Sequence, residues 1–510
     1  MFYNNRRILF LPAVISFIIA LLLVLKFSFP ISWDVYYHIH MADLYMSNGL
    51  VFWDYLTVAP AGRLIMYPPL FHLFLAGISC ITGLSLKDVC VLLEPFFTFI
   101  LVGIITYMAY RLFDNVKYGF FTGLFSMICF ATFNRGVICT PATITMAFMI
   151  ICCVMFYMGF NDNKLKYVLI SAVSLGLIAN LHMATFIITC GVIGLYAVVQ
   201  LIRGKINIKY LLVFIIVSCI IALPWWIYVE IKYGLFFNSL GGNPLRFDEF
   251  LAKYFGIIPT IFMIIGVYFL LKKRSEKSLF LLLWAFSIVC VSQVVYFGVQ
   301  TVSIRILEIS AYPLVFIAGY GFMQVIGKIT NKNYKKIVII LLLIYATSTS
   351  MAYTDSYTPE LLTPDENDIM ILPDSIHMVL DPVGSTYKPS IISSRYGNST
   401  LAHDRYDVME WFTNNTDHKI AVCEDSILDT IIVSTSRTPV IYGGFTESIP
   451  EYVVDPVHII ENHSTVNELH DLNIEYLVLN HDTPIPFYAK CVYENSNYKI
   501  CKINIWIILR

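Results

Sequence analysis

An aspartate, Asp34, follows directly on the first long apolar segment, in the run Trp33-Asp34-Val35-Tyr36-Tyr37-His38-Ile39-His40. A carboxylate beside an apolar segment is costly unless it is solvated or paired, and such acids are often functional. His38 comes four residues later, so both side chains share one helix face. The spacing predicts an acid–base couple or a shared divalent metal. The alternatives are that Asp34 caps a helix starting near Val35 and that His38 is a plain interfacial residue.

Three arginines have the chemistry to bind a phosphate. Arg63 follows a Pro-Ala-Gly turn, and Arg135 and Arg305 are expected at the outer ends of apolar spans. Guanidinium groups hold phosphate in a bidentate way, so three of them around one cavity would suit a phosphate or pyrophosphate. The alternative for each is that it snorkels to the membrane interface. Arg305 also has Glu308 one turn further on, which allows a local ion pair.

Imidazole, carboxylate and aromatic groups cluster around the same loop. His38, His40 and Asp54 are the candidate ligands for a divalent metal, manganese or magnesium, because imidazole and carboxylate both suit manganese. Tyr37 and its aromatic neighbours are candidates to stack on a bound ligand, with anchoring at the lipid interface as the alternative.

The elements that must position these residues are mostly membrane helices. Hydrophobic residues make up 58% of the chain and charged residues 14%, and the mean hydropathy is +0.71. Such values lie outside the range of soluble domains. We predict a multi-pass α-helical membrane protein of about 11 spans. They are a retained signal anchor at 8–29 and segments near 89–110, 118–133, 141–160, 167–181, 184–202, 210–229, 255–271, 278–297, 309–327 and 337–352.

Charge divides the chain into two domains. Residues 1–352 hold 25 of the 34 Lys and Arg but only 12 of the 35 Asp and Glu. Residues 353–510 hold the other 9 Lys and Arg and the other 23 Asp and Glu. The second domain is predicted to be acidic, soluble and α/β, with strands near 419–423, 439–442 and 474–480, helices near 403–413, 425–434 and 464–472, and a hairpin at 491–503. No basic patch with interleaved aromatics occurs, which argues against nucleic acid as a partner.

Basic residues also predict the orientation. If the apolar stretch 66–84 lies along the outer surface, 17 Lys and Arg fall in the short loops 1–7, 111–117, 161–166, 203–209, 272–277 and 328–336, and seven fall on outer segments. The positive-inside rule favours this arrangement. The N-terminus is then cytoplasmic. The large loop 31–88, with Asp34, and the C-terminal domain 353–510 are extracytoplasmic.

Three segments resemble a known family. They are Leu86-Lys87-Asp88-Val89-Cys90-Val91-Leu92-Leu93-Glu94-Pro95-Phe96-Phe97, Gly123-Leu124-Phe125 with Asn134-Arg135-Gly136-Val137, and Glu410-Trp411-Phe412-Thr413-Asn414-Asn415-Thr416. They are similar to segments of the GT-C superfamily, and most of all to the archaeal-type catalytic subunit of oligosaccharyltransferase. The resemblance implies that Asp34 acts as a base and that the sugar donor is carried on polyprenyl phosphate.

Two motifs of that subunit are missing. Its second outer loop brings an Asp-x-Glu pair for the metal, whereas this chain has Thr140-Pro141-Ala142-Thr143-Ile144-Thr145. Near the place of its Trp-Trp-Asp-Tyr-Gly signature stands Ala421-Val422-Cys423-Glu424-Asp425. The chain retains the more general GT-C arrangement, in which one acid of an outer loop is the base and a metal is dispensable.

The sequence therefore predicts an integral glycosyltransferase of the cell membrane that uses a polyprenyl-phosphate-linked sugar on the outer face, with this donor and membrane lipid as its partners. Asp34 is the predicted base. The predicted substrate-binding residues are His38, Arg63, Arg135, Arg305 and Tyr37. The alternative, favoured by the missing acid pair, is a non-catalytic GT-C-like membrane protein whose outer domain binds glycan or a protein. A transporter is a third alternative, but no inverted repeat is evident.

Overall fold

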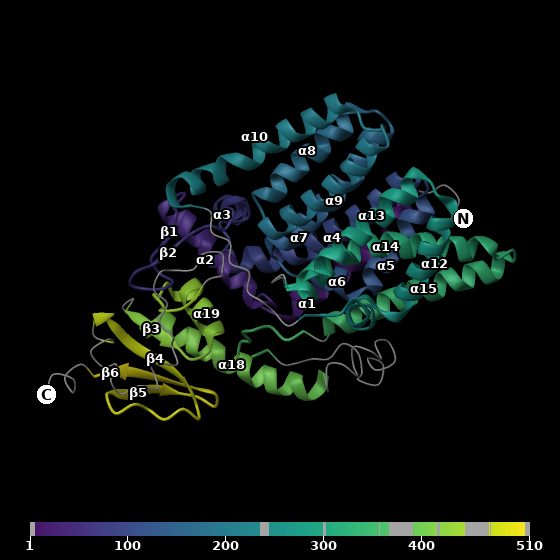
Figure 1. Ribbon diagram of the computed structural model, residues 1–510. Helices are drawn as coiled ribbons and strands as arrows, with labels where there is room; N and C mark the ends of the chain where they lie inside the picture. Colours follow the sequence, from purple (N-terminus) through teal and green to yellow (C-terminus); the bar gives the residue numbers. More distant parts are fainter. Residues whose placement is uncertain are drawn as a thin grey trace.

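The computed structural model describes residues 6–234, 244–298, 302–355, 357–366, 391–415, 419–443, 469 and 471–504. Figure 1 shows a large helical body with a smaller domain of strands and helices beside one end of it. The label N lies at the opposite end of the helical body from the sheet. The chain is thus a multi-pass helical membrane protein with a C-terminal α/β domain.

Eight helices of the described ranges are long and apolar enough to cross a membrane. They are α1 (Leu11–Lys26), α4 (Leu86–Phe113), α7 (Pro141–Asn161), α9 (Met183–Ile202), α10 (Ile208–Tyr233), α13 (Glu276–Gln293), α14 (Ser303–Lys328) and α15 (Lys332–Asp355). The pair α5 (Val116–Ile128) and α6 (Phe130–Gly136) is bent by 85° and counts as a ninth if it is one span. The domain boundary predicted at residue 352 falls in the last turn of α15.

Eight or nine spans are fewer than the 11 predicted, and the reason is helix length. Helices occur at every predicted place, but α8 (Leu165–Ala179) has 15 residues and α12 (Ile257–Lys273) has 17. At 1.5 Å per residue they are about 22 and 26 Å long, less than the roughly 30 Å of hydrocarbon. Apolar composition marked both segments correctly and did not show where their helices end.

The loop after α1 contains secondary structure that the apolar pattern does not reveal. It consists of α2 (Trp33–Asn48), the antiparallel strands β1 (Trp53–Asp54) and β2 (Arg63–Leu64), and α3 (Leu70–Thr82). Further short elements are 3-10 turns at Arg6–Phe10 and Val294–Phe297, α11 (Phe247–Phe250) and a π-helical turn at Leu251–Phe255.

The C-terminal domain is built on a four-stranded sheet of order β3-β4-β6-β5. The strands are β3 (Ile420–Cys423), β4 (Ile474–Asn480), β5 (Ala489–Glu494) and β6 (Tyr498–Ile503), and only the β3–β4 pair is parallel. Two helices accompany it, α18 (Ile391–Asn415) and α19 (Ser426–Ser436). Instead of the predicted strand near 439–442 there are two isolated bridges, both at Val440, to Thr57 and to Ala421. The predicted helix at 464–472 lies almost wholly outside the described residues.

The first loop is joined to this domain through its backbone. The amide of Val440 donates to the carbonyl of Leu56 at 2.8 Å, and the amide of Ala59 donates to the carbonyl of Val440 at 2.9 Å. On the neighbouring helix, Arg437 Nε lies 2.7 Å from Asp43 Oδ2 of α2. These contacts fix the loop and the domain as one surface.

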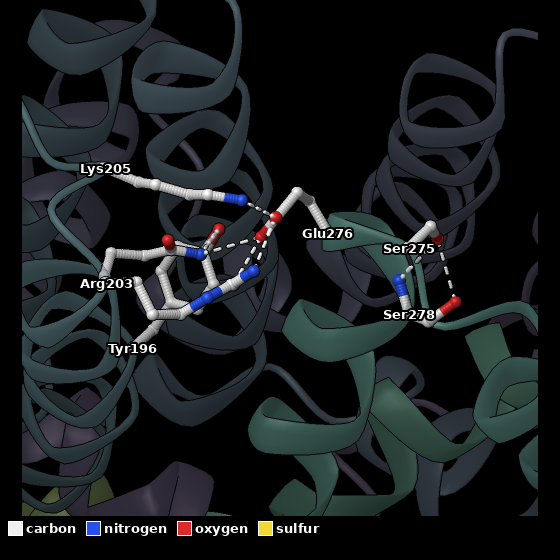
Figure 2. A network of polar contacts seen from close by, with 7 residues as sticks. Tyr196, Arg203, Lys205, Ser275, Glu276 and Ser278 are labelled. Carbon is white, nitrogen blue, oxygen red and sulfur yellow. Dashed lines mark hydrogen bonds and ion pairs between the residues drawn. The ribbon is translucent and has the colours of Figure 1, made fainter.

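A polar network ties two loops at the far end of the helical body (Figure 2). Arg203 donates to both carboxylate oxygens of Glu276, at 2.6 and 2.7 Å, and Lys205 contacts the same carboxylate. The network joins the α9–α10 and α12–α13 connections, which are two of the loops predicted to be cytoplasmic. Opposite charges thus hold helix pairs together where apolar packing ends.

Helices α12 and α14 pack closely because two glycines face each other's helix. A Cβ at Gly321 would lie 2.0 Å from the carbonyl oxygen of Phe262, and one at Gly266 would lie 2.2 Å from that of Ile317. Small residues permit such close approach between membrane helices.

We expect Gly321→Ala to destabilise the protein by about 1–3 kcal/mol, because the added methyl forces α12 and α14 apart. The melting temperature in detergent measures this. The matched control is Gly194→Ala in α9, where an added Cβ meets nothing within 4 Å. An equal melting temperature for both variants would contradict the close packing of α12 on α14.

Candidate functional site

Asp34 lies in the first turn of α2, one residue inside the helix. The N-cap is Ser32, so the alternative that Asp34 caps a helix starting near Val35 is wrong. Its side chain is only partly exposed. Burial raises the pKa of Asp34 above its ordinary value, Arg305 and Arg135 oppose this rise, and Glu308 adds to it. A carboxylate whose pKa is raised is a better proton acceptor.

The three charged groups that act on Asp34 form one ion-pair cluster. Glu308 Oε2 lies 2.7 Å from Arg135 Nη2 and 3.6 Å from Arg305 Nη1. The local ion pair of Arg305 with Glu308, which the sequence offered as the alternative to phosphate binding, is present in the structure. The two arginine side chains differ in exposure, with 10% for Arg135 and 55% for Arg305. Arg135 is thus buried against its carboxylate, whereas Arg305 keeps a surface for an anionic ligand.

The bend between α5 and α6 puts Arg135 in this cluster. Two threonine hydroxyls hold the short helix α6 after the bend. Thr98 donates to the carbonyl of Gly136 at 2.9 Å, and Thr143 donates to the carbonyl of Arg135 at 2.7 Å. These bonds satisfy carbonyls that a seven-residue helix leaves open.

Polar atoms without hydrogen-bond partners gather around the same cluster. Within the described ranges, the buried hydroxyls of Tyr312 and Tyr357 and Oε1 of Glu94 have no hydrogen-bond partner. Arg135 and Glu308 act electrostatically on both tyrosines. An unsatisfied buried polar group costs about 1–3 kcal/mol, and such groups require an explanation beyond stability.

The C-terminal domain adds a carboxylate to the region. Glu360 pairs with Arg405, whose Nη2 lies 2.8 Å from Asp425 Oδ2. The Tyr498 hydroxyl donates to the same Oδ2 at 2.7 Å. Burial raises the pKa of Glu360, Arg405 opposes the rise, and Asp34 contributes a smaller repulsion. The domain therefore extends to the neighbourhood of Asp34.

Arg63 lies in a different, fully buried cluster of the first loop. Its Nε donates to Thr57 Oγ1 at 2.9 Å, and Thr57 is bonded to Asp54. Asp54 Oδ2 also lies 2.9 Å from His40 Nε2. The guanidinium group stands 5.4 Å from the ring centre of Tyr37. The structure does not bring Arg63 into the Arg135–Arg305 cluster, and Tyr37 packs with it inside the loop.

His38 is buried one turn after Asp34 and contacts a second histidine. Its Nδ1 lies 2.9 Å from His72 Nε2, and the two rings stack. Burial lowers the pKa of His38, and His72 and His182 lower it further. The ring is therefore neutral at physiological pH, in a pocket completed by Tyr67 and Phe71.

The predicted metal ligands do not converge. His40 and Asp54 bind each other, while His38 turns to His72. Among the described residues no group of three or more His, Cys, Asp or Glu is placed to hold a metal ion. In this arrangement His38, His40 and Asp54 do not form one common set of ligands.

Sequence reasoning missed three residues that interact with the predicted site residues: His72 and His182, which act on His38, and Glu360, on which Asp34 acts. His182 lies between α8 and α9, and Arg135 and Arg305 act on it electrostatically. A histidine between two apolar segments, at an end predicted to face outside, was the available signal. The sequence contained no signal for Glu360, because the position of this residue depends on how the C-terminal domain packs on the helical body.

Comparison with known proteins shows the fold. No family model and no curated protein matches the sequence. ArnT from Cupriavidus metallidurans, solved with undecaprenyl phosphate, has a TM-score of 0.62 and 13% identity, over 96% of this chain and 97% of that one. The archaeal oligosaccharyltransferase AglB from Archaeoglobus fulgidus, in complex with an inhibitory peptide and a dolichol-phosphate, has a TM-score of 0.57 and 13% identity, over 92% and 69%. It has also been solved with Zn and sulfate. The arabinofuranosyltransferase AftD from Mycobacteria has a TM-score of 0.57 and 13% identity, over 98% of this chain and 40% of that one.

The chain therefore has the fold of the GT-C superfamily of membrane glycosyltransferases. The likeness predicted from the first loop is confirmed at the level of the fold.

The buried pair of Asp54 and His40 generates a stability prediction. Burial raises the pKa of Asp54, but His40, Arg63 and Thr57 outweigh it and hold the pKa well below its usual range. Asp54→Asn should cost about 2–3 kcal/mol at pH 7, as expected for a lost charged hydrogen bond. A carboxyl with a depressed folded pKa stabilises above its unfolded pKa, near 4, and loses that contribution as the pH falls.

The melting temperature of wild type and Asp54→Asn, measured between about pH 7 and pH 3, checks this. The difference should shrink below about pH 4. Asp482→Asn, on a fully exposed carboxylate, is the control. A difference that grows on acidification would show that Asp54 is not held as a carboxylate.

Proposed function

We propose that this chain is an integral-membrane glycosyltransferase that transfers a sugar from a polyprenyl-phosphate-linked donor to an acceptor on the outer face of the membrane. The observation that carries the proposal is the partly buried Asp34, whose carboxyl group feels the charges of Arg305, Arg135 and Glu308, together with the ion pairs that join these three residues. Proteins of the same fold have been solved with undecaprenyl phosphate and dolichol-phosphate, which supports a lipid-linked donor.

The transfer step assigns a role to Asp34. The acceptor hydroxyl oxygen forms a bond to the anomeric carbon of the sugar, and the bond from that carbon to the phosphate oxygen breaks. The hydroxyl proton passes to the carboxylate of Asp34, whose raised pKa suits a general base. The bonding electrons leave with the polyprenyl phosphate. Base catalysis of this kind contributes about 10²–10⁴-fold in rate.

The negative charge of the leaving phosphate requires a fixed positive partner. We assign this role first to Arg305, whose side chain is the more exposed member of the cluster. Arg135 supports it from the buried side, where Glu308 orients its guanidinium group. Arg63 is assigned to holding the first loop, because Thr57 and Asp54 engage it there. His38 and Tyr37 line the same loop.

The orientation is part of the proposal. The N-terminus is placed in the cytoplasm, and Asp34 and the C-terminal domain are placed outside. The grouping of the loops supports this, because the network of Arg203 and Glu276 joins two loops of the predicted cytoplasmic set (Figure 2). In Figure 1 the sheet lies beside the opposite end of the bundle.

The proposed transfer step does not use a metal ion. The sequence has no acid between Thr140 and Thr145, and the described side chains form no three-ligand group. The alternative function, a non-catalytic protein that binds glycan or a partner, rests on the same missing acids. The assay below distinguishes the two functions.

We expect Asp34→Asn to lower transfer from a polyprenyl-phosphate-linked sugar by about 10²-fold or more, because an amide cannot accept the proton. Binding of the donor should change little, since the arginines are intact. Turnover with a radiolabelled donor, alongside a donor-binding assay, measures both. Asp482→Asn is the control, because it makes the same change at a fully exposed carboxylate of the C-terminal domain.

Transfer that stays near the wild-type rate in well-folded Asp34→Asn would remove the base from the mechanism. Absence of transfer in the wild type, over donors of several sugars, would favour the non-catalytic alternative.

A further inference from the structure

His182 forms the N-cap of α9 through its imidazole ring. The ring nitrogen Nδ1 accepts from the backbone amide of Thr185 at 3.3 Å and lies 2.8 Å from Thr185 Oγ1. A nitrogen that accepts from an N–H carries no proton itself. The proton of the neutral ring is therefore on Nε2, which makes that nitrogen a hydrogen-bond donor.

The ring is held neutral and in place. Burial and, to a smaller extent, the positive charges of Arg135 and Arg305 together lower the pKa of His182 to about 4. The preceding turn is fixed by Asn180, whose side chain donates to the carbonyl of Ile221 at 2.7 Å. The carbonyl of Asn180 also accepts from the amide of Leu70 in α3, at 3.3 Å. The donor thus stands on a turn anchored to two neighbouring helices.

The surroundings of His182 select the kind of ligand. Two guanidinium groups, those of Arg135 and Arg305, act electrostatically on the ring, and the ring in turn acts on His38 of the first loop. The ring of Tyr67 lies 6.4 Å away between centroids. Within the described part of the chain no acceptor bonds to the Nε2–H group. A neutral donor beside two cations suits an anionic oxygen, because it donates a directed hydrogen bond to the oxygen and adds no further positive charge next to the two arginines.

We propose that His182 is a further donor-binding residue, and that its Nε2–H group donates to a non-bridging phosphate oxygen of the polyprenyl-phosphate carrier. The inference deepens the proposed function and rests on it. Arg305 provides the positive charge that attracts the phosphate, and the hydrogen bond from His182 orients one of its oxygens. His182 also connects the phosphate to the first loop, in which Asp34 stands.

The test separates capping from ligand binding. His182→Asn places an amide oxygen near the position of Nδ1, so α9 keeps its cap, but no donor reaches the position of Nε2. Binding of undecaprenyl phosphate to the full chain in nanodiscs should weaken by about tenfold, as expected for one lost bond to a charged acceptor. His182→Gln, whose longer amide extends toward that position, should retain most of the affinity.

His481→Asn is the matched control, because this histidine is 46% exposed on the C-terminal domain. It should bind as the wild type does. Equal affinity of His182→Asn and wild type would overturn the inference. So would an equal loss in the Asn and Gln variants together with lower melting temperatures, since that result describes a structural cap only.

The variant Arg305→Ala distinguishes a failure of this inference from a failure of the proposed function. Weak binding in Arg305→Ala with full binding in His182→Asn keeps the phosphate site and removes His182 from it. No binding of undecaprenyl phosphate to the wild type, or no effect of Arg305→Ala, would overturn the phosphate site itself.

Discussion

One carboxylate shared between two arginines is the interaction on which the site depends. Glu308 contacts Arg135 from α6 and Arg305 from its own helix. A buried arginine without a partner would cost several kcal/mol. Glu308 removes that cost for Arg135 and leaves Arg305 only partly neutralised, at a distance of 3.6 Å. The cluster therefore keeps a net positive charge beside Asp34, which stabilises an anionic ligand and still leaves the aspartate an acceptor.

The fold delivers these groups from parts of the chain far apart in sequence. Arg135 and Glu308 are 173 residues apart, and they meet because α6 turns sharply after α5. The first loop carries Asp34 to the same place and is pinned by Val440 of the C-terminal domain. The C-terminal domain is thus bonded to the loop that carries Asp34, and Asp34 acts electrostatically on Glu360.

The sequence predicted what depends on local pattern. Asp34 was identified because it follows an apolar anchor, and the ion pair of Arg305 with Glu308 because helix geometry brings residues three apart together. The strands at 420–423 and 474–480 followed from short buried runs. Helix length was less predictable, since α8 ends at Ala179 while its apolar pattern continues to Leu181.

Tertiary contacts decided the rest. Arg63 has the same chemistry as Arg305, and only the folded loop shows that Thr57 and Asp54 engage it. The metal site expected from His38, His40 and Asp54 required the two histidines to face one way, but they lie two residues apart on α2 and bind different partners. The position of His182 between two apolar segments was a weak signal, because only the folded chain shows that Arg135 and Arg305 act on it electrostatically.

A structure of the chain with undecaprenyl phosphate bound tests the central claim most directly. The account predicts the phosphate group within hydrogen-bond distance of Arg305, on the side of the cluster that faces Asp34. A phosphate bound elsewhere in the bundle, with Arg305 still paired only to Glu308, would contradict the account.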